Sequence, residues 1–371
     1  MSESMIKQSV PFIDEGDIES VQAALRYYWG DRRGEGIRKA EKLISEITRQ
    51  KYTYMTSHCT GALHTAIRVF KLSHGDEIIA PNLSWVASIS PAIHEGCLIK
   101  LVDVDIKTGC ISPSSVQDVI SKKTKAIIGV NLFGNPCNWN QLQSIAANNE
   151  CKLLEDNAEG LGGHFCDAPL GSFGDISCTS YHATKIITAG QGGSISTSNV
   201  DYLDDIKSQI HHGILKKRED DPFYWSNELG CNYTYSDMQA ALVHSQLTKL
   251  DLLVQNRRRV FSMYNEALQD IDNINIKFQN VNGSNRWMIL ASIDGCLKED
   301  VVKEAAKHDI ELRPCFYTLS EMPPFSQLKS IDTPNSDYLS KYCFSLPNGM
   351  HIDFNSIDRV TECLKIIAAR V

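Results

Sequence analysis

The chain has 371 residues, of which 42% are hydrophobic and 22% are charged. This composition is typical of a folded globular protein, and the length predicts two unequal domains. Lys and Arg total 37 against 45 Asp and Glu, a net charge of −8, which argues against nucleic acid or an anionic membrane as a partner. We find neither a secretory signal nor an apolar run of transmembrane length, so we expect a cytoplasmic protein.

The cysteine and histidine patterns do not predict a metal site. Twelve cysteines are scattered along the chain, and no pair has CxxC spacing, so we expect buried, reduced thiols. His211 and His212 are adjacent and would point to different sides of an element. No metal is predicted.

The first half of the chain alternates helical patterns with short apolar runs. An amphipathic helix ends the stretch 29–50, and apolar runs then alternate with helices as far as "CKLLEDNAE" at residues 151–159. This alternation predicts βαβ units on a mostly parallel sheet that is covered by helices. Because such sheets bind ligands at the carboxyl ends of their strands, we expect the site at that edge.

The pattern changes after the stretch 171–199. Shorter strands, more typical of antiparallel pairing, are predicted beyond residue 199, and a single long helix is predicted over about 235–268. We place the domain boundary in that helix, between a large α/β domain (1–250) and a small α+β domain (251–371). In the small domain we expect strands at "INIKF", "RWMILASI" and "IELRPCF", with helices near 298–308 and 355–370.

Lys185 lies in "SYHATKIITAGQGG", with no acidic residue within five positions and with glycines that allow close backbone approach. A lone loop lysine is more often solvated than catalytic. Asp156 and Glu159, however, follow a predicted strand, and Trp85 follows another. Taken alone, the acidic pair would be a helix cap and Trp85 a core tryptophan.

The helix that begins near Cys59 and Thr60 offers free backbone N–H groups to an anion, although Thr60 alone would be an ordinary N-cap. A lysine, a carboxylate, an aromatic ring and such a helix start are together what pyridoxal phosphate requires. Motifs for other cofactors are missing: there is no GxxxxGK[ST] loop, and no GxGxxG fingerprint is complete.

Blocks such as "SHCTGALHTA", "DEIIAPNLSWVAS", "LLEDNAEGLGG", "GSFGDISCTSYHATKIITAGQGG" and "GCNYTYSDMQAAL" follow one another along the chain. In these blocks, and nearly end to end, the sequence resembles the DegT/StrS family of sugar-nucleotide aminotransferases. The resemblance implies an aspartate-aminotransferase-like fold (fold type I) with pyridoxal 5'-phosphate as cofactor. Departures are Cys59 in place of a usual glycine, Gln191 in place of glutamate, and Thr234 where a basic residue is common.

The resemblance also implies roles for single residues. Lys185 would form the Schiff base, and Asp156 would pair with the pyridinium nitrogen. The other implied cofactor contacts are Glu159 near the ring hydroxyl, Trp85 on the ring face, and Cys59, Thr60, Ser180 and the other subunit's Asn232 at the phosphate. A homodimer with shared active sites follows. His182 and Arg313 are candidate substrate contacts, and a structural ion pair is an equal alternative for Arg313.

The implied reaction is transfer of an amino group from glutamate to a nucleotide-linked 4-keto-6-deoxy sugar, as in perosamine synthases, for amino sugars of O-antigen or lipopolysaccharide. "RPCFYTLSEMPPF" resembles this branch most. The alternatives are a 3-keto sugar aminotransferase of the same family and a pyridoxal phosphate-binding regulatory protein without turnover. One relative dehydrates its sugar and has histidine in place of the lysine, so Lys185 argues against that reaction.

Overall fold

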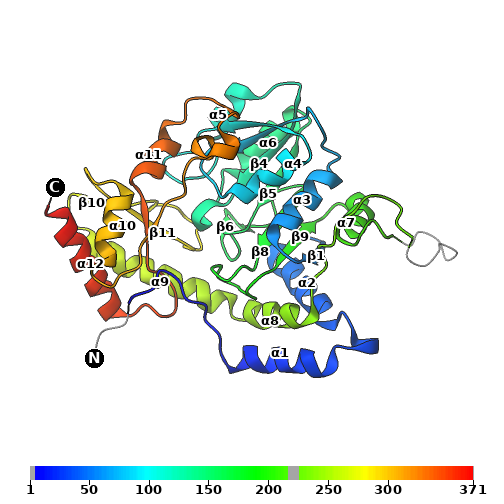
Figure 1. Cartoon of the computed structure of the whole chain (residues 1–371), viewed down its shortest axis with the longest axis horizontal. Coiled ribbons are helices and arrows are strands. Elements are labelled where there is room, and N and C mark those ends of the chain that lie inside the picture. Colours follow the sequence, from blue (N-terminus) through cyan, green and yellow to red (C-terminus); the bar gives the residue numbers. More distant parts are fainter. Residues whose placement is uncertain (1–4, 216–224, 371) are drawn as a thin grey trace.

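The computed structural model describes residues 5–215 and 225–370. Its largest feature is a sheet with the strand order β1-β9-β8-β5-β4-β2-β3-β13 (Figure 1). The bounds are β1 Tyr52–Thr56, β9 Gly193–Thr197, β8 Ile176–Ser180, β5 Lys152–Asp156, β4 Thr124–Val130, β2 Glu77–Pro81, β3 Leu98–Val102 and β13 Lys329–Ser330.

The strand directions bring most of the strand ends to one edge of this sheet. The strands from β8 to β13 run parallel to one another, whereas β9 is antiparallel to both β8 and β1. Every strand except β9 therefore has its carboxyl end at the same edge. The prediction of a mostly parallel sheet is confirmed. The antiparallel strand β9 lies before residue 199, whereas the sequence predicts antiparallel strands after it. Between β9 and residue 235 the described residues form helix α7 (Leu203–Ile210) and an isolated bridge of His211 with Asn232, but no strand.

The sheet is accompanied by helices along the first two thirds of the chain. These are α1 Glu15–Tyr27, α2 Glu35–Thr48, α3 Cys59–Val69, α4 Ser90–His94, α5 Pro113–Val119, α6 Trp139–Asn148, α7 Leu203–Ile210 and α8 Asp237–Leu247. Leu63 and Ile67 of α3 share one hydrophobic core with β2 and with Leu142 of α6. In α2, Ala40 and Ile44 are fully buried, as the predicted amphipathic pattern requires.

A second, antiparallel sheet has the order β10-β11-β14-β12. Its strands are β10 Ile274–Ile276, β11 Ile289–Ile293, β14 Phe344–Leu346 and β12 Arg313–Pro314, and the nearby helices are α9 Leu250–Leu268, α10 Lys298–Ala306, α11 Pro334–Tyr342 and α12 Phe354–Ala368. The predicted strands and helices of the C-terminal region are thus present. A short hairpin pairs β6 (His164–Phe165) with β7 (Ala168–Pro169).

The prediction of one helix over 235–268 is wrong, because α8 and α9 are separate helices. The hydroxyl of Thr248 donates to the carbonyl of Ser245. Nζ of Lys249 lies 2.8 Å from Asp14, which precedes α1, and 2.7 Å from Asp17, which lies in the first turn of α1. These contacts hold the break between the helices. Figure 1 shows α8 beside α1 and α9 leading on to the second sheet.

Two connections cross the predicted division at residue 250, which stays a prediction. β13 returns from the C-terminal part of the chain and pairs with β3 of the large sheet. Near the other end, Ile6 forms a bridge with Ile310 and belongs to the same hydrophobic core as α12. Each region therefore has its own sheet, while the chain passes between them more than once.

All twelve cysteines are free, and nine are buried, whereas Cys166 is exposed and Cys231 and Cys296 are half-buried. Within the described ranges, no group of three or more His, Cys, Asp and Glu side chains has the geometry of a metal site. None of the described helices combines the length and apolar character that a bilayer span requires.

Candidate active site

Most of the predicted site residues lie at the carboxyl edge of the large sheet. β5 ends at Asp156 and β8 ends at Ser180. β1 leads into α3, which begins at Cys59, and Trp85 follows β2. Within this cluster, Nζ of Lys185 lies 3.3 Å from Oε1 of Glu159.

Asp156 is only 4% exposed. One carboxylate oxygen accepts a hydrogen bond of 2.7 Å from the Ser88 hydroxyl, and the other accepts one of 3.1 Å from the Ala158 N–H. Burial raises the pKa of Asp156, while these hydrogen bonds and the charge of Lys185 lower it. Among the described residues no basic side chain forms an ion pair with this carboxylate. Asp156 can therefore accept a hydrogen bond from a cationic N–H group.

Lys185 points at a second buried carboxylate. Its Nζ lies 3.3 Å from Oε1 of Glu159, and the other oxygen of Glu159 accepts a 2.8 Å hydrogen bond from the N–H of Phe133. Burial raises the pKa of Glu159, and the nearby charge of Lys185 opposes that rise. The Lys185 side chain is 15% exposed, so its amine is held within the site and remains accessible.

Trp287 lies against the same amine, although no local sequence pattern indicates a role for it. Nζ of Lys185 lies 3.8 Å from the centroid of a Trp287 ring, which is the geometry of a cation–π contact. The indole N–H donates to the carbonyl of Thr184 at 2.8 Å. The side-chain amide of Asn285 donates to the backbone carbonyl of Glu159 and accepts a hydrogen bond from the backbone N–H of Trp287. These contacts fix the positions of Lys185 and Glu159 relative to each other.

The cap of α3 differs from the one considered in the sequence. His58 is the N-cap, and its Nδ1 accepts a 2.8 Å hydrogen bond from the Gly61 N–H. Thr60 therefore lies inside the first turn, and it is exposed. The backbone N–H groups of Cys59 and Thr60 begin the helix and so have no partner within it. Burial raises the pKa of the Cys59 thiol and keeps it neutral.

Ser180, at the end of β8, and His182 lie on the segment that leads to Lys185. The Ser180 hydroxyl accepts from the His182 N–H at 3.3 Å, and Nδ1 of His182 lies 3.1 Å from the Thr184 hydroxyl. Burial lowers the pKa of His182, and the charge of Lys185 lowers it further. A neutral imidazole therefore lies beside the lysine, where a substrate could meet it.

Trp85 is 57% exposed, so its interpretation as a core tryptophan is wrong. Its ring centroid lies 5.9 Å from that of Phe316, which in turn lies 5.7 Å from that of Phe133. Phe133 adopts a left-handed conformation (φ 60°) that directs its N–H to Glu159. A row of aromatic rings thus extends from the buried carboxylate to the exposed indole.

Asn232 and Arg313 have no contact with this cluster among the described residues. Asn232 is exposed, and its side-chain oxygen accepts a 2.7 Å hydrogen bond from the Thr234 hydroxyl. Arg313 lies in the small sheet and pairs with Glu311 at 3.2 Å, which agrees with the ion-pair alternative.

The family follows from a comparison with known sequences. The sequence model of the DegT/DnrJ/EryC1/StrS aminotransferase family matches residues 11–365. The chain belongs to this family. It is therefore an aminotransferase, and the resemblance noted in the sequence is confirmed.

Relatives of this DegT-family aminotransferase include a GDP-perosamine synthase from Escherichia coli O157:H7, which is 30% identical over 85% of this chain and 86% of its own length. Two solved proteins have the same fold. One is a mutant of GDP-4-keto-6-deoxymannose-3-dehydratase (ColD) with bound GDP-perosamine. It matches with a TM-score of 0.88 and 25% sequence identity, over 97% of this chain and 100% of its own. The other is the E. coli GDP-4-keto-6-deoxy-D-mannose-3-dehydratase with bound hydrated PLP. It matches with a TM-score of 0.89 and 25% sequence identity, over 98% of this chain and 100% of its own.

Helicobacter pylori PseC, an aminotransferase of pseudoaminic acid biosynthesis, matches with a TM-score of 0.92 over 99% of this chain and 100% of its own. At 21% identity this match bears on the fold alone. Together with the strand order, it confirms the predicted fold type I architecture.

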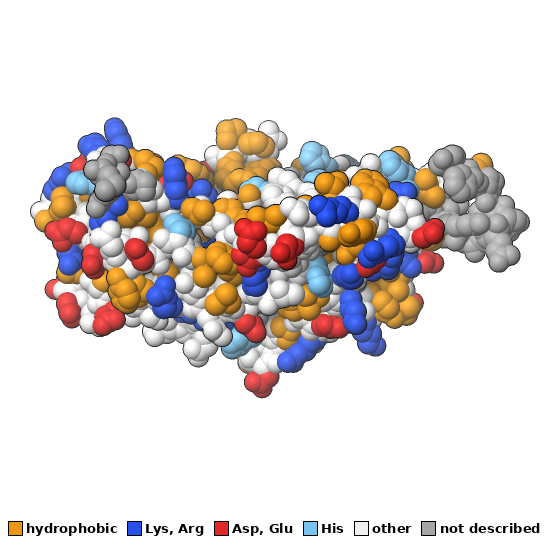
Figure 2. Space-filling model, turned by 90° about the horizontal axis from the view of Figure 1, so that it is seen from below, with side chains coloured by type: hydrophobic (Ala, Val, Ile, Leu, Met, Phe, Trp, Pro, Cys, Tyr) orange, Lys and Arg blue, Asp and Glu red, His pale blue; other side chains and the backbone are white. Residues whose placement is uncertain are grey.

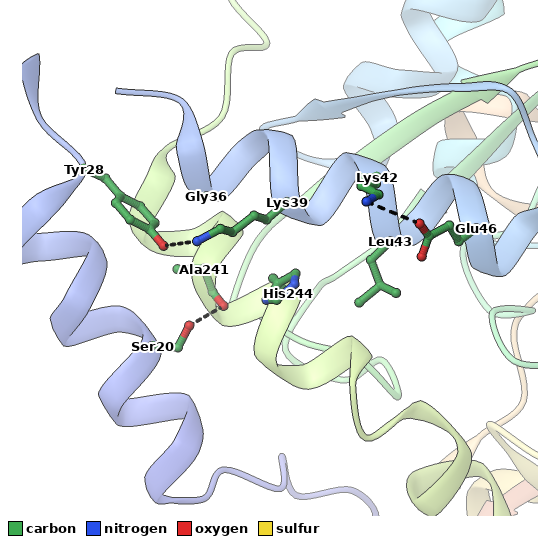
Figure 3. Close-up of a pocket in the computed structure, with 9 residues that line it drawn as sticks. All are labelled: Ser20, Tyr28, Gly36, Lys39, Lys42, Leu43, Glu46, Ala241 and His244. Atoms are coloured by element: carbon green, nitrogen blue, oxygen red, sulfur yellow. Dashed lines mark hydrogen bonds and ion pairs between the residues drawn. The ribbon is translucent and has the colours of Figure 1, made fainter. Parts of the chain in front are cut away.

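A pocket of about 420 Å³ between α1, α2 and α8 contains none of the predicted site residues of this aminotransferase (Figure 3). Figure 3 shows the two lysines of the pocket turned towards other side chains. Nζ of Lys39 lies 2.7 Å from Glu35 and 3.1 Å from the Tyr28 hydroxyl, and Nζ of Lys42 lies 3.9 Å from Glu46. These positive charges are thus already paired, and the reactive groups lie at the strand ends instead.

Proposed function

We propose that this aminotransferase moves the amino group of glutamate to carbon 4 of a GDP-linked 4-keto-6-deoxy sugar, with pyridoxal 5'-phosphate as cofactor. The observation that carries the proposal is the amine of Lys185, held 3.3 Å from Glu159 at the sheet edge where Asp156 is buried. The GDP-perosamine synthase relative and the dehydratase that binds GDP-perosamine support the choice of sugar nucleotide.

The chemistry of the side chains fits pyridoxal phosphate. Asp156 can accept a hydrogen bond from the protonated ring nitrogen, and Lys185 supplies the amine for the aldehyde. Glu159 would lie near the ring hydroxyl and Trp85 over the ring face. The N–H groups that begin α3 at Cys59 and Thr60, with the Ser180 hydroxyl, suit the phosphate. When bound, the cofactor acts as an electron sink for negative charge that develops beside the transferred nitrogen.

The protein side chains would then control proton movement. As a neutral amine, Nζ of Lys185 can take the proton from the α-carbon of the amino donor, and in the second half-reaction it can deliver a proton to carbon 4 of the sugar. Ionised Asp156 favours a positive charge at the ring nitrogen. The aromatic row of Phe133, Phe316 and Trp85 covers one side of the site and limits the access of water.

We further infer a cytoplasmic homodimer with shared sites, in which Asn232 reaches the phosphate bound by the other subunit. Figure 2 shows hydrophobic side chains among acidic and basic ones on the face where α1 and α8 run. Tyr27, Trp29 and Leu229 are exposed hydrophobic residues of the N-terminal region and of the segment before Asn232. Such exposed side chains support an interface. The expected product serves O-antigen or another surface polysaccharide.

Turnover can be tested with glutamate and a panel of GDP-, dTDP- and UDP-linked 4-keto and 3-keto sugars, with the products identified by mass and NMR. We expect the 4-amino product from the GDP-linked 4-keto sugar. Amination of only the 3-keto sugars would favour the other branch of the family. A yellow protein whose colour persists with every amino donor would favour a regulatory protein.

The role of Lys185 is tested by Lys185→Ala, with Lys107→Ala as the matched control because Lys107 is an exposed lysine in the turn after β3, away from the site residues. We expect Lys185→Ala to abolish turnover and the control to retain it, with similar thermal unfolding in both. Normal turnover by Lys185→Ala would refute the assignment.

A further inference from the structure

Glu95, His64 and Tyr233 form a chain of short hydrogen bonds beside α3. Nε2 of His64 lies 2.6 Å from Oε1 of Glu95, and Nδ1 lies 2.7 Å from the Tyr233 hydroxyl. A carboxylate only accepts hydrogen bonds, so Nε2 donates to Glu95, and in the tautomer that has its single proton on Nε2 the Nδ1 atom accepts from Tyr233. The His64 and Glu95 side chains are 17% and 26% exposed, so water competes only partly for these bonds.

The backbone and ring of Tyr233 are also tied to the start of α3. Its carbonyl accepts a 2.8 Å hydrogen bond from the Ser57 N–H, and its ring lies 5.4 Å from that of His58 in an edge-on arrangement. A Cβ atom at Gly61 would lie 2.9 Å from Cγ of Tyr233. A glycine at position 61 is thus what permits this close approach.

A second contact holds the residue on the other side of Asn232. Arg68 of α3 lies 3.5 Å from Glu95, and its guanidinium donates to Sγ of Cys231 at 3.7 Å. Cys231 and Tyr233 are therefore both attached to α3, one through Arg68 and the other through His64. Asn232 lies between them and is exposed. Glu95 contacts both basic side chains and links the two attachments.

We infer that Glu95, His64 and Tyr233 are a positioning network that sets the place of Asn232. This inference rests on the proposed function, in which Asn232 completes the site of the other subunit. None of the three residues contacts Lys185 or Asp156 within the described ranges, and the contacts of Tyr233 with the start of α3 are made by its backbone and ring, so the loss of its hydroxyl should leave the site of its own subunit intact. Their effect should instead be felt in trans.

Heterodimers with two different affinity tags can separate effects in trans from effects in cis. One chain carries Lys185→Ala and supplies Asn232, and the other carries Asn232→Ala and supplies Lys185. Only one of the two sites is then intact, so the purified heterodimer should have about half of the wild-type rate, while both parental homodimers are nearly inactive. The rate is measured against the concentration of added pyridoxal phosphate.

Tyr233→Phe is then added to either chain, because this change removes the hydroxyl and keeps the ring against Gly61. On the chain that supplies Asn232, we expect the concentration of pyridoxal phosphate for half-maximal rate to rise about five- to tenfold, as for one lost hydrogen bond. On the other chain we expect no change. His64→Phe, which removes both bonds of the ring, should behave in the same way. Tyr338→Phe, which removes an exposed hydroxyl bonded to Lys277, is the matched control.

The outcomes distinguish the inference from the proposal on which it rests. If the heterodimer without Tyr233→Phe has no restored activity, the proposal that Asn232 completes the site of the other subunit is wrong, and the inferred role of the network fails with it. If activity is restored but Tyr233→Phe acts equally from either chain, or only from the chain that supplies Lys185, the shared site stands and the inference is overturned.

Discussion

Replacement of Ser88 by alanine tests whether Asp156 must be ionised. The Ser88 hydroxyl donates a 2.7 Å hydrogen bond to the buried carboxylate of Asp156. Hydrogen bonds to charged groups contribute about 1.5–3 kcal/mol, and 1.36 kcal/mol corresponds to a tenfold change in an acid dissociation constant. Loss of the bond should therefore weaken the acidity of Asp156 by a factor of about 10 to 100.

Burial already raises the pKa of Asp156, so Ser88→Ala moves it further in the same direction. A larger fraction of the carboxyl group is then protonated near neutral pH, and it supports the ring nitrogen less well. On the acidic limb of the pH profile, where the ionised fraction of Asp156 is small, we expect kcat/KM to fall about 10- to 100-fold, and this limb should move to higher pH.

The assay is steady-state kinetics with glutamate and the keto sugar from pH 5 to 9. Ser177→Ala is the matched control, because Ser177 lies on the neighbouring strand β8 and its buried hydroxyl has no hydrogen-bond partner among the described residues. The control should leave the profile unchanged. An acidic limb at the same pH in Ser88→Ala and in the wild type would refute the reasoning.

Three further changes test other contacts. Burial raises the pKa of Glu41 from 4.5 to about 7. As the pH rises from 4.5 to 7, the unfolded chain therefore loses the proton of Glu41 while the native state still holds it. The free energy of unfolding should therefore fall by about 3 kcal/mol from pH 4.5 to 7, and Glu41→Gln should flatten the melting temperature recorded over this range. Trp287→Leu removes the aromatic ring that lies against Lys185 and the indole hydrogen bond to the Thr184 carbonyl, so Nζ is positioned less firmly and kcat should fall about tenfold. Trp287→Phe keeps a ring and should lose less, and stopped-flow half-reactions with glutamate measure both. Gly134 has φ 85° and faces Asn285 so closely that a Cβ would clash, so Gly134→Ala should destabilise the fold by about 2–4 kcal/mol in urea unfolding.

The sequence predicted those parts of the site that lie at strand ends. Asp156 and Ser180 are the last residues of β5 and β8, and Cys59 opens the helix after β1. Strand and helix patterns are local, and the rule for parallel sheets brings such ends together without knowledge of side-chain packing.

The partners of these residues could not be predicted because they come from distant parts of the chain. Ser88 reaches Asp156 across 68 positions, and Trp287 donates to the Thr184 carbonyl across 103. Their side chains are common in any core, so no local pattern marks them. His58 was missed as the cap of α3 because histidine is not among the usual N-cap residues.

The break between α8 and α9 has the same kind of cause. The residues around 248 favour helix as well as their neighbours do, and no glycine or proline marks an end there. The contacts of Lys249 with Asp14 and Asp17 come from a segment more than 230 positions earlier.

The bridge between Ile6 and Ile310 has a consequence for the order in which the protein can fold. Gln8 also donates a buried hydrogen bond to the hydroxyl of Ser345, 337 positions later. On the ribosome, Ile6 and Gln8 emerge long before the residues that receive them, so they must wait until positions 310 and 345 have been synthesised. Contacts of such long sequence separation form late and slowly. The N-terminal segment should therefore be among the last parts of the chain to gain protection from proteases during synthesis.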